Sequence, residues 1–412
     1  MTTSTTGTTT STTAGAEATS ARPATTTLRG ITWEHPRGFD CQVAAAAAYE
    51  RLTGVRVVWE QRSLQAFADA PLDDLTARYD LLVIDHPHVP LAAAHGLLAP
   101  LDGHGHDEAL AALAGTSVGA GHASYAHGGH QYGLATDSAA QVAVRRPDLL
   151  ADRPEGWDEV LDLAAEGRVL WPAKPIDAWS SLCTLAANRG TPVGATPGTF
   201  LDDEDAAPVL DLLHRLAERV PGWCLEANPI EVAEALSGGR PDADPRWAYA
   251  PLAYGYTNYG RPGFRPHRLR YEDIPAGPRG VAGSQLGGAG VAVSARASDP
   301  DAARAYALWV ASPQVQAGVY YDAGGQPGYA PAWDDDRLNA DSWDFFRGTR
   351  RTLEQAWVRP RTAGFIELQD TVSPWVTATL RGELDDATLL RRAGEAAARL
   401  LVPDETPEGG TT

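Results

Sequence analysis

Five acidic and histidine side chains of this 412-residue chain stand where they could contact a small molecule. Glu34 and His35 follow the first of three apolar, strand-like runs, Asp85 and His86 follow the third, and Asp137 lies in a later extended stretch. Carboxylate and imidazole groups can transfer protons in a pocket, and carboxylates also accept hydrogen bonds from a polar ligand. These residues therefore fit two functions, acid–base catalysis by all five and ligand binding by the three carboxylates.

Aromatic residues with a polar group are favoured in this chain, which has 12 Trp and 13 Tyr but only 7 Phe. Flat aromatic faces cover the apolar C–H face of a sugar ring, while planar carboxylates, amides and guanidinium groups pair with its hydroxyls. The residues that we expect to serve as such platforms lie near predicted loops and are Trp33, Trp179, Tyr254, Tyr256 and Tyr259.

Further candidate ligand-binding residues precede and begin a glycine-rich strand. Gln285 supplies an amide, and Gly287 and Gly288 allow the backbone to approach a hinge or a ligand closely, although an ordinary turn uses glycine in the same way. Asp85 also has an alternative role, because an aspartate before a helix is a common N-cap.

The chain offers little evidence for a metalloprotease, nucleotide-binding or metal site. The chain contains neither HExxH nor a Walker phosphate-binding loop. Histidines that are close in the sequence could bind a metal if two or three of them converged with a carboxylate. These groups are His86/His88, His104/His106 and His122/His127/His130. Because most of these lie in loops rich in Pro or Gly, we expect no metal site, and we expect no cofactor.

The composition limits the partners of the chain. With 53 acidic and 34 basic residues the net charge is -19, which repels nucleic-acid phosphates and anionic lipid. No stretch approaches the roughly 20 apolar residues of a membrane span. A hydrophobic content of 43 % over 412 residues is enough for two domains with their own cores.

The termini and cysteines raise two further questions. Residues 1–27 are rich in Thr and show no secretory signal, so the protein stays in the cytoplasm if Met1 is native. Alternatively, Met1 replaces the acylated cysteine of a trimmed lipoprotein outside the cytoplasm. Cys41, Cys183 and Cys224 are expected to be small buried residues, although one Cys183–Cys224 bridge is possible.

Alternating apolar runs and helix-forming stretches predict a parallel α/β sheet. We expect strands at 28–33, 55–60 and 79–85, with a helix over 39–53 between the first two. From residue 132 onward, two short extended pieces are expected to cross to a second lobe.

Five ordered segments resemble the extracellular solute-binding proteins of ABC importers, above all the class that binds sugars. They are the strand–helix–strand unit of residues 28–60, Asp85 with Leu97-Leu98-Ala99-Pro100-Leu101-Asp102, Tyr132-Gly133-Leu134 with Arg146-Pro-Asp-Leu-Leu150, Gly156-Trp157-Asp158-Glu159-Val160-Leu161, and Gly287-Gly288 with residues 301–316 and Gly324-Gly325-Gln326-Pro327. The chain departs from the family at the crossing, where Ala139-Ala140 or Val142-Ala143 replaces a Tyr-Asn pair.

The resemblance implies a two-lobed periplasmic-binding-protein fold, type II-like, with two α/β lobes joined by a hinge. Its expected parts are a first lobe of residues 28–134 plus 289–330, a second lobe of residues 135–288 plus 331–403, and tails at 1–27 and 404–412. It also implies a monomer that captures a small polar solute, such as a carbohydrate, for ABC permease subunits. The alternative is a cytoplasmic enzyme or sensor built on the same fold.

Overall fold

The architecture was obtained as a computed structural model, which describes residues 1–2, 26–63 and 71–402. The tails expected at 1–27 and 404–412 therefore lie almost wholly outside the described residues. None of the helices in the described part is long and apolar enough to cross a membrane.

The first lobe is built on three parallel strands, as predicted. β1 (Thr27–Trp33) lies between β2 (Arg56–Arg62) and β3 (Leu81–Ile84), and α1 (Asp40–Thr53) connects β1 to β2. Successive residues of β3 enter different core clusters, because a strand buried on both faces sends its side chains alternately to each side. The β1 and β3 strands thereby fix the loops that follow them.

Two long strands connect the first lobe to the second, in place of the two short pieces expected from the sequence. β6 (Gly133–Arg145) is one continuous strand, antiparallel to β9 (Leu286–Val293) along its first half and to β7 (Tyr249–Tyr254) and β8 (Arg270–Glu272) along its second half. β9 also pairs with β3, so the sheet order is β2-β1-β3-β9-β6-β7. The exact lobe boundaries within these strands stay a prediction.

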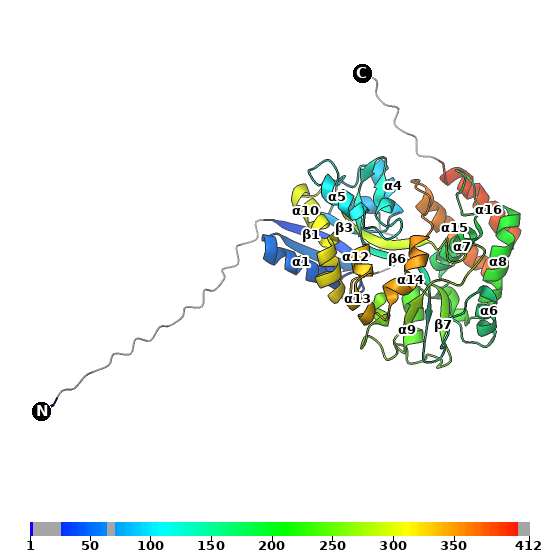
Figure 1. Cartoon of the computed structure of the whole chain (residues 1–412). Helices are drawn as coiled ribbons and strands as arrows, with labels where there is room; N and C mark the ends of the chain where they lie inside the picture. Colours follow the sequence, from blue (N-terminus) through cyan, green and yellow to red (C-terminus); the bar gives the residue numbers. More distant parts are fainter. Residues whose placement is uncertain (3–25, 64–70, 403–412) are drawn as a thin grey trace, which may run out of the picture.

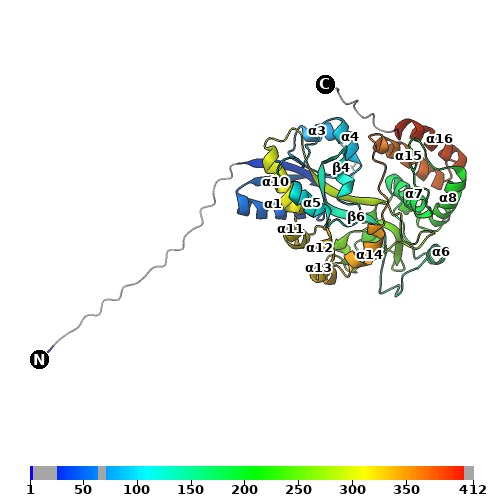
Figure 2. The same cartoon turned by 45° about the horizontal axis from the view of Figure 1, so that its top comes forward.

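Helices surround both lobes (Figures 1 and 2). In both views the first-lobe helices α1 and α10 lie at one end of the molecule, and α7, α8, α15 and α16 lie at the other. The remaining helices of the first lobe and the connecting region are α3 (Leu72–Thr76), α4 (His88–Ala94), α5 (Asp107–Ala114), α10 (Pro300–Ala311), α11 (Pro313–Val315), α12 (Ala330–Trp333), α13 (Asp336–Asp341) and α14 (Phe345–Glu354).

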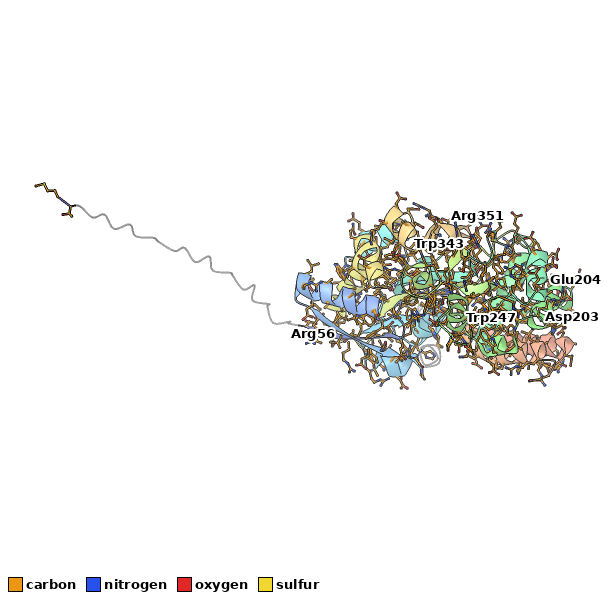
Figure 3. All side chains as sticks on the ribbon, turned by 90° about the horizontal axis from the view of Figure 1, so that it is seen from below. Arg56, Asp203, Glu204, Trp247, Trp343 and Arg351 are labelled. Atoms are coloured by element: carbon orange, nitrogen blue, oxygen red, sulfur yellow. The ribbon has the colours of Figure 1, made fainter. Side chains whose placement is uncertain are left out.

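The second lobe has one large core. Its helices are α6 (Trp157–Ala165), α7 (Pro175–Arg189), α8 (Asp203–Ala217), α9 (Pro229–Ser237), α15 (Phe365–Leu380) and α16 (Asp386–Leu400). Short elements complete the chain. They are the strands β4 (Ala126–His127) and β5 (His130–Gln131), the 3-10 turns Ala123–Tyr125, Gly222–Glu226 and Thr257–Gly260, and the π-helical turn Gln316–Tyr320. Arg56 on β2 and Asp203 and Glu204 at the start of α8 mark opposite ends of the molecule (Figure 3).

The three cysteines are buried and unbridged, as the composition favoured. Cys183 lies on α7 and Cys224 in the turn Gly222–Glu226, both within the second-lobe core, and Cys41 lies on α1. All three are free thiols, so the alternative of a Cys183–Cys224 bridge is wrong. The Sγ of Cys41 also donates to the carbonyl of Arg37 at 3.0 Å.

Candidate functional site

A cleft of about 710 Å³ lies between the lobes. Its first-lobe wall is formed by the loops after β1 and β3, which contribute Arg37 and Asp85. Its second-lobe wall is formed by the first turns of α7 and α9 and by one side of α15. β6 and β9 form the floor. The strand ends of the first lobe thus meet helix starts of the second, which is the position where α/β sheets bind ligands.

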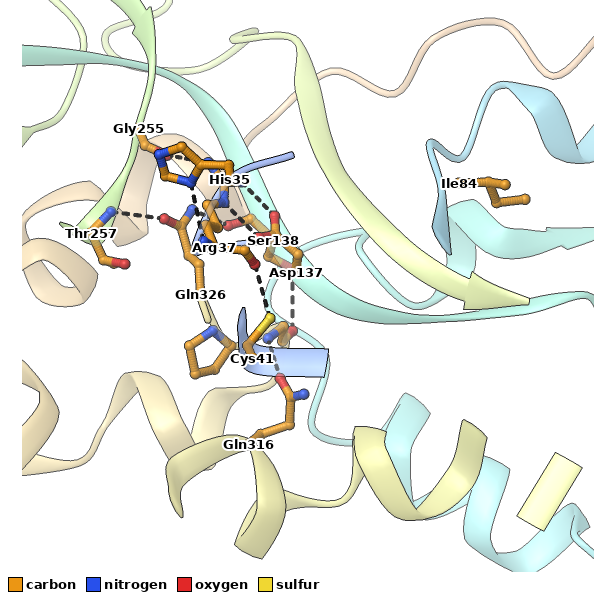
Figure 4. Close-up of polar contacts among 12 residues, drawn as sticks. His35, Arg37, Cys41, Ile84, Asp137, Ser138, Gly255, Thr257, Gln316 and Gln326 are labelled. Carbon is orange, nitrogen blue, oxygen red and sulfur yellow. Dashed lines mark hydrogen bonds and ion pairs between the residues drawn. The ribbon is translucent and has the colours of Figure 1, made fainter. Parts of the chain in front are cut away.

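Arg37 ties the first-lobe wall to the floor (Figure 4). Its Nε and Nη2 donate to the two carboxylate oxygens of Asp137 at 2.6 and 2.5 Å, and its Nη1 donates to the carbonyl of Gly255 at 2.7 Å. The guanidinium also lies over the ring of Tyr256, 4.4 Å from its centre. Burial by itself lowers the pKa of Arg37, but the Asp137 carboxylate raises it above its ordinary value. The pair is therefore a fixed ionic contact of the closed cleft.

Glutamine side chains bind the backbone beside this ion pair (Figure 4). Gln326 donates from Nε2 to the carbonyl of Ser138 at 2.9 Å and accepts at Oε1 from the amide of Thr257 at 3.0 Å. Ser138 is on the crossing strand β6, and Thr257 follows β7. Gln326 therefore holds the crossing strand and the start of the second lobe in one arrangement.

A second arginine extends across the cleft from the second-lobe side to the first-lobe wall. Nη2 of Arg359, in the segment before α15, donates to both oxygens of Asp85 at 2.8 and 2.7 Å. Arg361 donates to the carbonyls of His86 and Ala126 at 2.9 and 2.7 Å. Burial raises the pKa of Asp85, but Arg359 and His86 outweigh it, and the pKa is lowered overall. These contacts close the lobes over the cleft, and they use Asp85 as an ion-pair partner instead of an N-cap.

A buried polar network joins the cleft to the second-lobe core. Gln285 donates from Nε2 to the hydroxyls of Ser180 and Tyr254, both at 2.9 Å, and its backbone amide donates to Thr184. Ser180 in turn donates to the carbonyl of Ile176. Because the Ser180 proton is used in that bond, its oxygen must accept from Gln285, and this fixes the orientation of the amide.

Asp177 is the cleft carboxylate that differs from the others. It lies in the first turn of α7, is 5 % exposed and lines the cleft. Burial is the largest influence on its pKa and raises it well above the ordinary value, while Lys174 acts in the opposite direction. On the neighbouring helix α15, Gln369 and Ser373 line the same wall.

The two glycines of β9 are needed for the shape of the floor. A Cβ atom on Gly287 would lie 2.6 Å from the Tyr254 ring, and one on Gly288 would lie 2.3 Å from the carbonyl of Asp137. Gly288 also has a φ of +103°, which other residues rarely adopt. Both positions therefore permit close approach in the strand, so the ordinary-turn alternative does not describe them.

The structure brings most of the predicted ligand-binding residues to the cleft. Those that line it are Trp33, Asp85, Asp137, Tyr254, Tyr256, Gln285, Gly287 and Gly288. Three others do not: Glu34 is exposed beside β2, Trp179 stacks on Phe200 in the second-lobe core, and Tyr259 is buried with its hydroxyl on Glu234. The expectation that Trp179 and Tyr259 form platforms in the cleft is therefore wrong.

The five residues expected to form an acid–base group do not converge in one pocket. Only Asp85 and Asp137 line the cleft, and each is ion-paired to an arginine. Burial, followed by Arg37 for His35 and by Arg359 for His86, lowers the pKa of each imidazole to about 3. Among residues 1–2, 26–63 and 71–402, no three His, Cys, Asp or Glu side chains form a group that could hold a metal ion.

Sequence reasoning missed Arg37, Arg359, Asp177, Ser180 and Gln369. The one local signal for Asp177 was Pro175, since proline is favoured at the first position of a helix. Arg37 stands in the loop after the first strand, where an arginine could have been considered as a ligand or ion-pair partner. Nothing in the local sequence connects Arg359 to Asp85, from which it is 274 residues distant.

Comparisons with known proteins agree with this geometry. The family model of bacterial extracellular solute-binding proteins matches residues 44–342, well over half of the chain. Among solved structures, maltose-bound MalE3 of T. maritima is similar with a TM-score of 0.74 and 16 % identity, covering 91 % of this chain and 99 % of that one.

Two further structures extend the likeness. A solute-binding protein of an ABC transporter from Thermotoga lettingae, bound to alpha-D-tagatose, has a TM-score of 0.77 and 16 % identity, covering 92 % of this chain and 100 % of that one. The GacH receptor of Streptomyces glaucescens, solved unliganded and with acarbose, has a TM-score of 0.74 and 18 % identity, covering 91 % and 98 %. At such identities the likeness shows the fold, which is the two-lobed fold expected from the sequence.

Proposed function

The chain belongs to the bacterial extracellular solute-binding proteins, and we propose that it captures a small carbohydrate or polyol between its lobes for an ABC permease. The observation that carries this proposal is the cleft of about 710 Å³, which is large enough for a small oligosaccharide. Arg359 and Asp85 hold its two walls together. A closed cleft of this kind buries a ligand from both sides.

The lining of the cleft supports a polar, ring-shaped ligand. Trp33, Tyr254 and Tyr256 offer aromatic surface, and Asp177, Ser373 and Gln369 offer hydrogen-bonding groups. This combination suits a sugar, whose ring has an apolar face and a rim of hydroxyls. The similar proteins named above were solved with maltose, tagatose and acarbose, which supports the same class of ligand.

We propose that the protein works as a monomer and that the permease subunits are its partner. Opening of the lobes would release the solute, and the ion pairs across the cleft would be broken in that step. The affinity for the solute is then the contact energy minus the cost of closing the lobes.

A thermal-shift screen with neutral sugars, polyols and amino sugars tests the proposal. A bound ligand should raise the melting temperature, and the increase should grow with ligand concentration. Glucose, maltose, cellobiose and ribitol are suitable neutral probes. If no sugar, polyol or amino sugar stabilises the protein, the proposed function is wrong.

A further inference from the structure

The charge of the Asp177 carboxylate is only partly offset in the described part of the chain, where Lys174 is the basic residue that acts on it. The carboxylate forms no hydrogen bond or ion pair with any described side chain or backbone group, although the residue is 5 % exposed. It lies in the first turn of α7 without capping that helix. The helix dipole favours an acidic residue there, but this weak effect does not replace the water that a buried carboxylate loses.

The other charges near the cleft have protein partners. Arg37 is paired with Asp137 and Arg359 with Asp85. The remaining two charged residues of the lining, Lys174 and Asp370, each have an interaction of their own. Asp177 is therefore the carboxylate of this lining that the protein leaves for a ligand.

The charges of all the residues that line the cleft also sum to a negative value. Its basic residues are Arg37, Lys174 and Arg359, and its acidic residues are Asp85, Asp137, Asp177 and Asp370. When Asp177 is ionised, the three positive and four negative charges leave 3 − 4 = −1. His88 also lines the cleft, and burial lowers the pKa of its imidazole, which favours the neutral form. A ligand with a single positive charge would make the closed cleft neutral.

We propose that the natural solute carries a positively charged nitrogen, as an amino sugar does, and that Asp177 is its counter-ion. This inference rests on the proposed function of the cleft. A sugar hydroxyl can donate one hydrogen bond to Asp177 but leaves its charge uncompensated in a closed cleft. An ammonium group donates hydrogen bonds and also cancels the charge.

A matched pair of disaccharides tests the inference by titration calorimetry at pH 6, where the amines are protonated. Cellobiose and the β-1,4 disaccharide of glucosamine have the same linkage and ring shape and differ in replacing hydroxyls by ammonium groups. Glucose and glucosamine form a second pair. We expect the amine of at least one pair to bind about 30-fold more tightly than its neutral partner, the usual effect of a buried charge pair.

The Asp177→Asn variant should remove most of that preference, so that the amine and its neutral partner bind with similar affinity, because an amide can still form hydrogen bonds but carries no charge. The control is Asp203→Asn, which changes a first-turn acid of α8 at the exposed far end of the second lobe (Figure 3) and should leave the preference intact. If Asp177→Asn does not fold, the comparison of amine and neutral sugar on the wild-type protein decides alone.

Two results overturn the inference in different ways. Neutral sugars that bind as tightly as their amines, or an amine preference that survives in Asp177→Asn, would show that Asp177 is not the counter-ion, and the proposed function would stand. If neither amines nor neutral sugars bind, the proposed function fails together with the inference.

Discussion

The carboxylates on the two sides of the cleft differ in whether they have a partner within the protein. On the first-lobe side, Asp85 and the floor residue Asp137 each have a guanidinium within 2.8 Å. On the second-lobe side, Asp177 is 5 % exposed and forms no hydrogen bond or ion pair through its carboxylate among the described residues. Buried ion pairs hold a geometry, whereas a buried group without a partner is available to a ligand. We therefore infer that the first-lobe wall maintains the shape of the cleft, whereas the second-lobe wall recognises the ligand.

The largest effect is expected from Arg37→Met. It leaves the Asp137 carboxylate buried without a partner, and breaking a buried pair in this way costs about 3–5 kcal/mol of unfolding free energy. Urea denaturation followed by circular dichroism measures the loss. The control is Arg29→Met, because the Arg29–Glu60 pair is about half exposed and should contribute less than about 1 kcal/mol. Equal losses in the two variants would contradict a structural role for the buried pair.

Arg359→Gln should weaken solute binding with a smaller effect on folding. The variant removes the ion pair to Asp85 across the cleft, so closure becomes less favourable and affinity should fall about ten-fold. Calorimetric titration with the best ligand measures this change. Arg350→Gln is the control, since Arg350 pairs with the partly exposed Glu354 on the surface of α14. An unchanged affinity in Arg359→Gln would show that the pair does not help to close the lobes.

Gly287→Ala tests the shape of the floor. The new methyl group would lie 2.6 Å from the Tyr254 ring, so the ring must shift, and a shift toward the cleft would reduce its space. We expect several-fold weaker binding, and the overpacking itself should cost about 1–3 kcal/mol of folding stability. Gly222→Ala is the matched control, because no atom lies within 4 Å of its Cβ position. Binding as tight as in the wild type would mean that Tyr254 has room to move elsewhere.

The smallest effect is a pH dependence of stability. Because the pKa of Asp177 is raised in the folded protein, its contribution to stability is complete below the pKa of the unfolded chain and is lost as pH rises through the folded value. Without ligand, Asp177→Asn should therefore melt about 2 °C higher than the wild type at pH 7 and equally at pH 4. A lower melting temperature of the variant at pH 7 would contradict an unpaired buried carboxylate.

The sequence was sufficient to predict those parts of the fold that depend on a local pattern of residues. The run ending at Ile84 is apolar at every position, and this is typical of a strand buried on both faces; Asp85 after it was therefore placed correctly at the cleft. Trp179 was misplaced because α7 is buried on all sides, so its spacing gives no direction for a single aromatic residue. The Arg359–Asp85 pair depends on the packing of the lobes, which no local pattern contains.

A crystal structure with the tightest amine or neutral sugar tests the central claim most directly. We predict that the ligand lies between the lobes, with a ring against Trp33 or Tyr254 and a donor group within hydrogen-bond distance of the Asp177 carboxylate. The Arg359–Asp85 pair should remain closed over it. A ligand bound at the outer surface, with the interlobe cleft holding only water, would contradict the account.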